Sequence, residues 1–100
     1  MKQVSVIAEW QTTAEGNWVF KQAALKLVEE SKKETGCIAY DLYESDSEPL
    51  KYTFVEVWKD DKALEQHTKR NHYITMVQIM QLAAKPTVRI LKKVSKDGKA

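Results

Sequence analysis

Two histidines and a tryptophan lie within fifteen residues of one another, and they are the side chains of this sequence best suited to chemistry. Trp58 ends an alternating apolar segment, and His67 and His72 follow it as the two histidines of the chain. An imidazole titrates near neutral pH, so either ring could accept a proton from a bound molecule or donate a hydrogen bond to it. Five residues along one helix turn the second ring about 140° away from the first. A break in the helix around Lys69–Asn71 would let both rings face one cavity.

A simpler interpretation needs no chemistry from these rings. One imidazole could pack in the core or cap a helix while the other lies in solvent, and the sequence leaves both interpretations open. Two imidazoles without a third ligand nearby do not make a catalytic zinc site, so we expect no metal. Asp60 and Asp61 are better explained as helix caps, and Cys37 as a small residue that fills the core.

Aromatic and apolar side chains near Trp58 are candidates for the wall of a cavity. Tyr40 and Phe54 lie on neighbouring predicted strands, and Met76 and Met80 lie on the helix expected to cover them. Such a wall would bind a flat aromatic molecule by stacking and by burying its surface, and methionine adapts to irregular cavities. Packing in the core explains the same residues without a ligand, so both interpretations stay open.

Glu56 shares a strand face with Phe54 and Trp58, so its carboxylate is expected to point inward. A buried carboxylate needs a partner, and Lys92, Arg89 or a residue of a second chain are the candidates. We expect a structural ion pair here rather than a general base.

Composition limits the class of protein. The chain has 100 residues, of which 43% are hydrophobic and 30% are charged, and a net charge of +2, as expected for one globular domain. We expect residues 1–94 to form this domain and residues 95–100 to form a polar, mobile tail. A single cysteine cannot form an internal disulfide, and no segment resembles a signal peptide or a membrane span, so we expect a cytoplasmic protein. The basic pair Lys69–Arg70 is too small for a nucleic-acid surface, so we expect neither a nucleic-acid nor a membrane partner.

Hydrophobic periodicity predicts an alternation of strands and helices. Strands are expected where apolar residues alternate, and helices where they recur every three or four residues. Asn17, Asp60 or Asp61, and Asn71 are expected to cap the helices, and Lys85–Pro86 to end the last helix. The predicted elements are a strand over 4–10, a helix over 18–33, strands over 37–44 and 51–58, a short helix over 61–67, a longer helix between Asn71 and Lys85, and a strand over 87–94.

The order β-α-β-β-α-β is that of the ferredoxin-like α+β fold. Right-handed crossovers place the helices on one face of a four-stranded antiparallel sheet. The other face also carries apolar residues, such as Ile7, Val55 and Val57, and no helix remains to cover it. A second copy of the chain is the simplest cover, so we expect a homodimer built sheet against sheet.

Three segments of the sequence resemble the antibiotic biosynthesis monooxygenase (ABM) family. They are GCIAYDLYES at 36–45, YTFVEVWKDDKALEQH at 52–67 and NHY at 71–73. The resemblance covers nearly the whole chain in order and spacing, and it implies a ferredoxin-like chain that pairs into a dimeric α+β barrel. The paired histidines are most similar to the branch that holds quinol monooxygenases and isomerases of small phosphorylated sugars.

The resemblance carries over to some site residues and not to others. In the cofactor-independent members, a Trp that ends the third strand lines the substrate pocket together with an Asn and a Tyr. Trp58 matches the Trp, but the other two positions hold Phe54 and Leu64. The haem-degrading members use an Asn in the first strand, which this sequence lacks, and a Trp and a His where it has His67 and Val77. We therefore expect no haem.

The resemblance implies a monooxygenase that oxidises a quinol or polycyclic phenol with O2 and without a cofactor. Trp58 would be a pocket wall, and His67 or His72 the base or hydrogen-bond donor. The expected substrate contacts are Tyr40, Phe54, Leu64, Met76 and Met80. Three isolated glycines cannot form a Gly-rich loop for a nucleotide or a flavin, so the electrons must come from the substrate itself.

Two other functions stay open. An isomerase of a small phosphorylated sugar would need a cation near the pocket for the phosphate, and Lys69, Arg70 and Arg89 are the candidates. A small-molecule-binding dimer without turnover is favoured by Phe54 and Leu64, because apolar residues in place of Asn and Tyr can hold a ligand without activating it.

Overall fold

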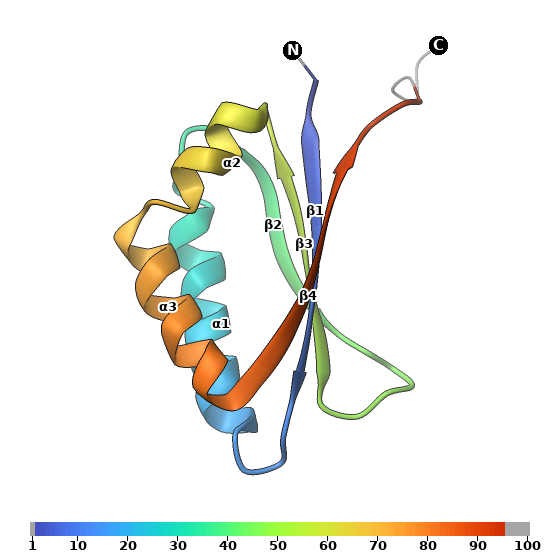
Figure 1. Cartoon of the computed structure of the whole chain (residues 1–100), viewed down its shortest axis with the longest axis vertical. Coiled ribbons are helices and arrows are strands. Elements are labelled where there is room, and N and C mark those ends of the chain that lie inside the picture. Colours follow the sequence, from blue (N-terminus) through green and yellow to red (C-terminus); the bar gives the residue numbers. More distant parts are fainter. Residues whose placement is uncertain (1, 96–100) are drawn as a thin grey trace.

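A four-stranded antiparallel sheet carries the helices on one of its faces (Figure 1). The computed structural model describes residues 2–95. The elements are β1 (Val4–Thr12), α1 (Asn17–Ser31), β2 (Cys37–Glu44), β3 (Lys51–Trp58), α2 (Asp61–His67), α3 (Asn71–Ala83) and β4 (Ala84–Lys92). The strand order β2-β3-β1-β4 makes this the predicted ferredoxin-like α+β fold. Within residues 2–95, no helix has both the length and the apolar character needed to cross a membrane. Of the predicted tail, residues 96–100 lie outside the described part.

The boundaries differ from the predicted ones mainly at β4. Helix α3 ends at Ala83 and β4 begins at the next residue, so the predicted helix end at Lys85–Pro86 was wrong. Pro86 lies inside the strand and pairs with Trp10. Because β4 is an edge strand, it tolerates a residue that cannot donate to a ladder. α3 therefore passes into β4 without a loop, and the Thr12 hydroxyl donates a 2.9 Å hydrogen bond to the Ala83 carbonyl at this junction.

The helix caps follow the predictions in part. Asp60 caps α2, where its carboxylate accepts a 2.8 Å hydrogen bond from the Ala63 backbone N–H. Asn17 and Asn71 were predicted as caps, but each lies inside its helix and the residue before it takes the cap position. The Asn17 side chain instead accepts a 2.6 Å hydrogen bond from the Tyr52 hydroxyl.

Strands β1 and β3 bury one face and leave the other partly exposed, as the alternation in the sequence predicts. The buried residues of the two strands are Val4, Val6, Ala8, Trp10, Tyr52, Phe54, Glu56 and Trp58, with Thr12 at the end of β1. Helices α1 and α3 pack against this face, where Phe20 and Met80 are fully buried. The covered face thus holds both the aromatic core and the carboxylate of Glu56.

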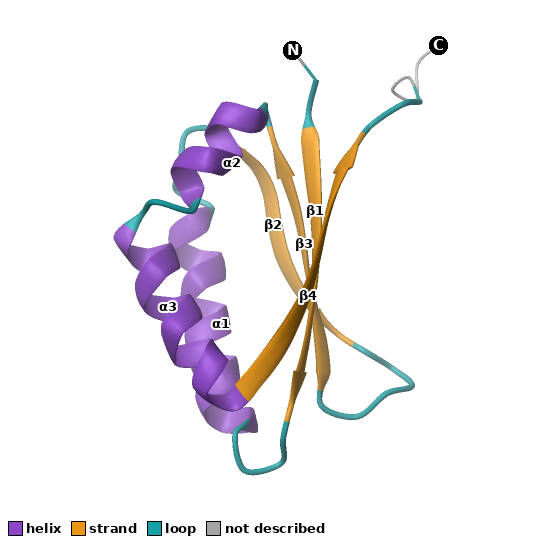
Figure 2. Ribbon diagram, viewed as in Figure 1, coloured by secondary structure: helices purple, strands orange, loops and turns teal. Residues whose placement is uncertain are grey.

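The helices gather over one part of the sheet and leave β4 uncovered (Figure 2). Val88 and Ile90 pair with Ala8 and Val6, which are buried, and yet they are 55% and 59% exposed. They therefore form a strip of apolar surface along the open edge of the sheet, on the same face as the helices.

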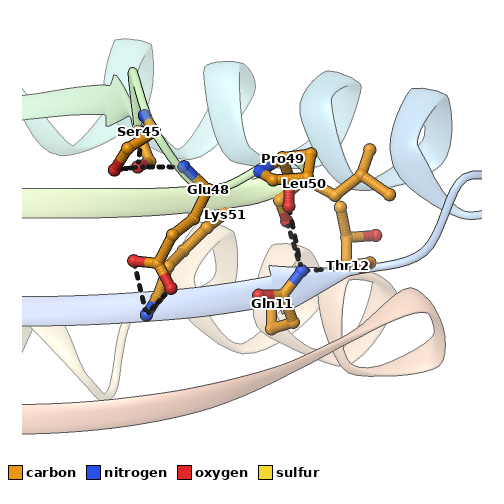
Figure 3. Close-up of polar contacts among 8 residues, drawn as sticks. Gln11, Thr12, Ser45, Glu48, Pro49, Leu50 and Lys51 are labelled. Carbon is orange, nitrogen blue, oxygen red and sulfur yellow. Dashed lines mark hydrogen bonds and ion pairs between the residues drawn. The ribbon is translucent and has the colours of Figure 1, made fainter.

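The loop between β2 and β3 is tied to the end of β1 (Figure 3). The Gln11 side-chain amide donates hydrogen bonds to the carbonyl oxygens of Pro49 at 3.3 Å and Leu50 at 3.1 Å. Within the loop, the Ser45 hydroxyl accepts a 2.9 Å hydrogen bond from the Glu48 backbone N–H. Leu50 has φ = 62°, in the left-handed region that costs a residue with a Cβ about 1 kcal/mol or more. This loop lies at the end of the sheet opposite to α2 (Figure 1).

Candidate functional site

A cavity of about 220 Å³ lies between the sheet and the helices. Its wall is mostly apolar and includes Leu27, Phe54 and Met80. The polar side chains in the wall are Tyr40, Glu56, His67, Thr68 and Tyr73. On its β4 side the cavity is bordered by the exposed strip of Val88 and Ile90. An apolar cavity with a few convergent polar groups is the usual form of a small-molecule site.

A turn between α2 and α3 brings both imidazoles to one carboxylate. Helix α2 ends at His67 and α3 begins at Asn71, so the helix is broken between the two histidines and both rings can point at the same group. Glu34 lies in the loop between α1 and β2. Its Oε2 atom lies 2.6 Å from Nδ1 of His67 and 2.7 Å from Nε2 of His72. The two rings therefore meet at Glu34, and only His67 lines the cavity.

Oε2 of Glu34 determines which nitrogen of His67 keeps a free lone pair. A carboxylate oxygen can only accept, so Nδ1 of His67 carries the hydrogen of this bond and, in the neutral ring, Nε2 holds the lone pair. Nε2 is buried and has no hydrogen-bond partner within residues 2–95. His67 belongs to the cavity wall, and its neutral ring keeps on Nε2 a proton acceptor that no group within residues 2–95 uses.

Burial keeps His67 neutral. Its side chain is 1% exposed, and desolvation lowers the pKa of the imidazole below the usual value of 6.5. Glu34 opposes this lowering of the pKa through its hydrogen bond and its charge, whereas the nearby charges of His72 and Arg70 add to it. At neutral pH the ring is therefore uncharged and able to accept a proton.

Aromatic rings pack around His67 and restrict its rotation. Its ring centroid lies 4.4 Å from that of Trp58, 4.9 Å from that of Tyr73 and 5.4 Å from that of Tyr40. Trp58 is fully buried and does not line the cavity. It acts on the site through its contacts with His67 and Glu56.

Glu56 places a second titratable group in the cavity wall. Its Oε1 accepts a 2.9 Å hydrogen bond from Nε1 of Trp58. Burial raises the pKa of Glu56 to about 7, although the hydrogen bond from Trp58 opposes this rise. The prediction of an ion pair with Lys92 or Arg89 was wrong, because Lys92 pairs with Asp61 instead. Residues two apart on a strand share a face, so the sequence already placed the Trp58 indole within reach of Glu56.

Most of the residues predicted for the site line the cavity: Tyr40, Phe54, Leu64, His67 and Met80. The other three do not. His72 is linked to the cavity through Glu34, and Trp58 through His67. Met76 packs against the core and is only partly buried.

Sequence reasoning missed Glu34, Thr68 and Tyr73. Glu34 is 33 residues from His67 along the chain, so no local spacing links the two, and only the fold brings them together. Tyr73 shares a face of α3 with Met76 and Val77, so its helical spacing was a usable signal.

Glu34 also supplies the third donor that the sequence lacked for a metal. Its carboxylate and the nitrogens of His67 and His72 lie within 4.8 Å of one another, and two imidazoles with a carboxylate are a donor set that zinc accepts. The expectation of no third ligand was therefore wrong. However, the positive Nε of Arg70 lies 3.7 Å from Oε1 of Glu34, and two short hydrogen bonds already use Oε2. These bonds account for the arrangement without a cation.

Comparison with known families gives the same assignment as the sequence motifs. Residues 3–79 match the family model described as "Antibiotic biosynthesis monooxygenase". The chain belongs to this family. The cavity and the cluster of Glu34, His67 and His72 are thus features of an ABM chain.

Three known proteins illustrate what the chain is similar to. "Uncharacterized protein sll1783" of Synechocystis sp. is 36% identical over 67 residues, which make up 65% of this chain and 46% of that protein. "Putative monooxygenase YcnE" of Bacillus subtilis is 35% identical over 54 residues, or 54% of this chain and 57% of that protein. The match thus spans about half the length of these curated relatives. A solved structure, "Crystal structure of antibiotic biosynthesis monooxygenase", is 28% identical with a TM-score of 0.87, covering 92% of this chain and 99% of that one.

Proposed function

We propose that the chain is a cofactor-independent monooxygenase that oxidises a quinol with O2 inside the cavity, and that residues 1–94 act as one unit in this reaction. The observation that carries the proposal is the buried, neutral His67, which belongs to the wall of an apolar cavity and whose Nε2 has no partner within residues 2–95. Membership of the ABM family and similarity to a protein named as a monooxygenase support it.

The role of His67 is to take a proton from a substrate hydroxyl. The quinolate that forms is electron-rich and can pass an electron to O2, after which the radical pair forms a carbon–oxygen bond. A hydroquinone and O2 then yield a hydroxyquinone and water, because one oxygen atom enters the ring and the other leaves with two substrate hydrogens. The substrate supplies all the electrons, so no external reductant is needed. An apolar wall favours this sequence by excluding bulk water from the charged intermediates.

Cavity size favours a small substrate. An apolar cavity of about 150 Å³ holds one benzene ring. The 220 Å³ present here therefore suits one ring or two fused rings. A larger polycyclic phenol would have to extend past Val88 and Ile90 at the open edge.

An oxygen electrode tests the proposal with hydroquinones of one, two and three rings. The matched variant is His67→Asn, whose amide can still donate to Glu34 but lacks an atom at the position of Nε2. We expect enzyme-dependent O2 uptake with one- and two-ring quinols and a loss of about 10²- to 10⁴-fold in the variant. Quinol binding without O2 uptake would instead support a binding protein without turnover.

The isomerase alternative has less support. Its candidate phosphate-binding residues, Lys69, Arg70 and Arg89, are not part of the cavity wall. Arg70 interacts with Glu34, and Arg89 pairs with Ile7 on the sheet face opposite to the helices. No cation therefore lies beside the cavity where a phosphate would need one, within residues 2–95.

We also propose that two chains pair into a homodimer. The sheet face opposite to the helices carries Ile7, Val55 and Val57 only partly buried, and Leu91 is 47% exposed beside them. The strip of Val88 and Ile90 is exposed on the other face. A second copy would cover apolar surface of this extent, which monomers rarely leave in contact with water.

A further inference from the structure

We propose that Glu34 and His72 are positioning residues for His67: Glu34 fixes the tautomer of the His67 ring, and His72 fixes the carboxylate of Glu34. The inference rests on the proposed function of His67 as the base. It assigns a role to a buried carboxylate from a distant loop and to the second histidine, neither of which touches the cavity.

The first step is the choice of tautomer. A neutral imidazole carries one hydrogen, on Nδ1 or on Nε2, and only the Nδ1–H form leaves a lone pair on Nε2. Glu34 Oε2 lies 2.6 Å from Nδ1 of His67, and an ionised carboxylate has no hydrogen to offer, so it selects the Nδ1–H form. Without this acceptor, no hydrogen bond of the ring would favour a lone pair on Nε2.

The second step is the charge that appears when His67 takes a proton. The imidazolium would form in a site where Glu34 and His67 are 7% and 1% exposed. Attraction between opposite charges is much stronger in such surroundings than in water. Glu34 therefore stabilises the protonated ring after proton transfer, as an orienting carboxylate does for a catalytic histidine.

The third step concerns the carboxylate itself. Nε2 of His72 lies 2.7 Å from the same Oε2, and Nε of Arg70 lies 3.7 Å from Oε1, so each oxygen of Glu34 has a partner. His72 is 22% exposed and Arg70 is 53% exposed. The shorter and less exposed contact is that of His72, and we assign to it the main role in holding Oε2 in line with Nδ1 of His67.

The experiment uses the full chain and two pairs of variants. Glu34→Gln replaces one acceptor oxygen by an NH2 group, which can force Nδ1 of His67 to accept and move its hydrogen to Nε2. Glu65→Gln is the control, because Glu65 is an exposed carboxylate on the same helix as His67. His72→Gln keeps a donor near Oε2, whereas His72→Leu removes it. Folding of each variant is checked by urea unfolding before any comparison.

Two readouts are measured. Nitrogen NMR of the histidine rings reports which nitrogen of His67 carries the hydrogen, whether or not the protein turns over a substrate. Steady-state O2 uptake with a hydroquinone reports kcat and KM. In the wild type we expect hydrogen on Nδ1 and none on Nε2 of His67.

We expect Glu34→Gln to move that hydrogen to Nε2 and to lower kcat by about 10²- to 10⁴-fold at little-changed KM. His72→Leu should lower kcat by about tenfold or more, and His72→Gln should restore most of the loss. A wild type whose neutral His67 carries its hydrogen on Nε2 would overturn the tautomer assignment, and equal rates for His72→Leu and His72→Gln would overturn the role of His72. A wild type with the expected tautomer and no O2 uptake would refute the proposed function and leave the tautomer assignment standing.

Discussion

The indole Nε1 of Trp58 donates a 2.9 Å hydrogen bond to Oε1 of Glu56, two residues earlier on the same strand face. This bond holds a carboxyl group in the wall of an apolar cavity, where burial raises its pKa to about 7. The cavity wall therefore holds two titratable groups: His67, whose pKa is lowered by burial, and Glu56, whose pKa is raised by it. Burial favours the neutral form of both groups, and it therefore lowers the pKa of the imidazole, which protonation charges, and raises the pKa of the carboxyl, which protonation neutralises.

Glu56 should make the protein less stable as pH rises. Its pKa is raised from 4.5 to about 7 in the folded state, so between these values the folded protein keeps a proton that the unfolded chain releases. The contribution of this group to the free energy of unfolding is thus fully present below pH 4.5 and is lost as pH rises through 7. A shift of this size corresponds to about 3 kcal/mol at most.

Glu56→Gln tests this dependence, because glutamine still accepts from Trp58 but cannot ionise. We expect the variant to match the wild type at about pH 4 and to exceed its free energy of unfolding by about 1–3 kcal/mol at about pH 8. Urea unfolding at both pH values provides the measurement. The contribution of His67 to the free energy of unfolding is the same in both proteins, so it cancels in the difference. A stability difference independent of pH would contradict the prediction.

The rate of O2 uptake should fall only in acid. The pKa of His67 lies below 6.5, so the ring stays neutral and active at neutral pH. A profile of kcat/KM against pH should therefore be flat around neutrality and fall below about pH 6.5 as His67 becomes protonated. The titratable or charged groups near the ring are Glu34, His72, Arg70, Tyr73 and Glu56. If kcat/KM already fell on acidification well above neutral pH, the base would be another group.

Gly36 should be needed for the close approach of α2. A Cβ atom at this position would clash with the Cβ of Ala63. We expect Gly36→Ala to destabilise the protein by about 1–3 kcal/mol, the usual cost of overpacking. Ala63→Gly should cost about 1 kcal/mol by itself, since glycine weakens a helix. The double variant should cost less than the sum of the two, and additive costs in urea unfolding would show that the two positions do not compete for space.

Leu50 should offer a stabilising substitution. Its φ of 62° lies in the left-handed region, which asparagine tolerates better than leucine. We expect Leu50→Asn to raise the free energy of unfolding by about 0.5–1 kcal/mol, because the hydrogen bonds of the loop use the Leu50 carbonyl and not its side chain. Leu50→Ala is the control and should give no gain from the backbone, since alanine keeps the steric penalty. Thermal unfolding of the three proteins decides the matter.

The proposed dimer makes a prediction about mass. Light scattering at micromolar concentration should give twice the chain mass of 11.5 kDa. Ile90→Lys places a charge on the exposed strip of β4 and should shift the protein toward the monomer if this strip lies in the interface. A wild-type monomer at these concentrations would refute the dimer.

The sequence predicted the fold well because each strand repeats its pattern locally. Alternation in β1 and β3 identified the buried faces, and the ordered motifs identified the ABM family. The site was harder to predict, because its central contact joins residues 33 positions apart. No periodicity relates Glu34 to His67, because the α1–β2 loop and the α2–α3 turn come together only in the folded chain. The end of α3 was misplaced for a different reason, since Pro86 is as acceptable in an edge strand as after a helix.

The loopless junction between α3 and β4 has a mechanical consequence. Met80 lines the cavity from α3, and Val88 and Ile90 border it from β4, with no flexible linker between the two elements. The hydrogen bond from the Thr12 hydroxyl to the Ala83 carbonyl joins this junction to the end of β1. We therefore expect a displacement of β4 to move α3 with it and to change the volume of the cavity, so that a molecule bound along β4 would also affect the ligand.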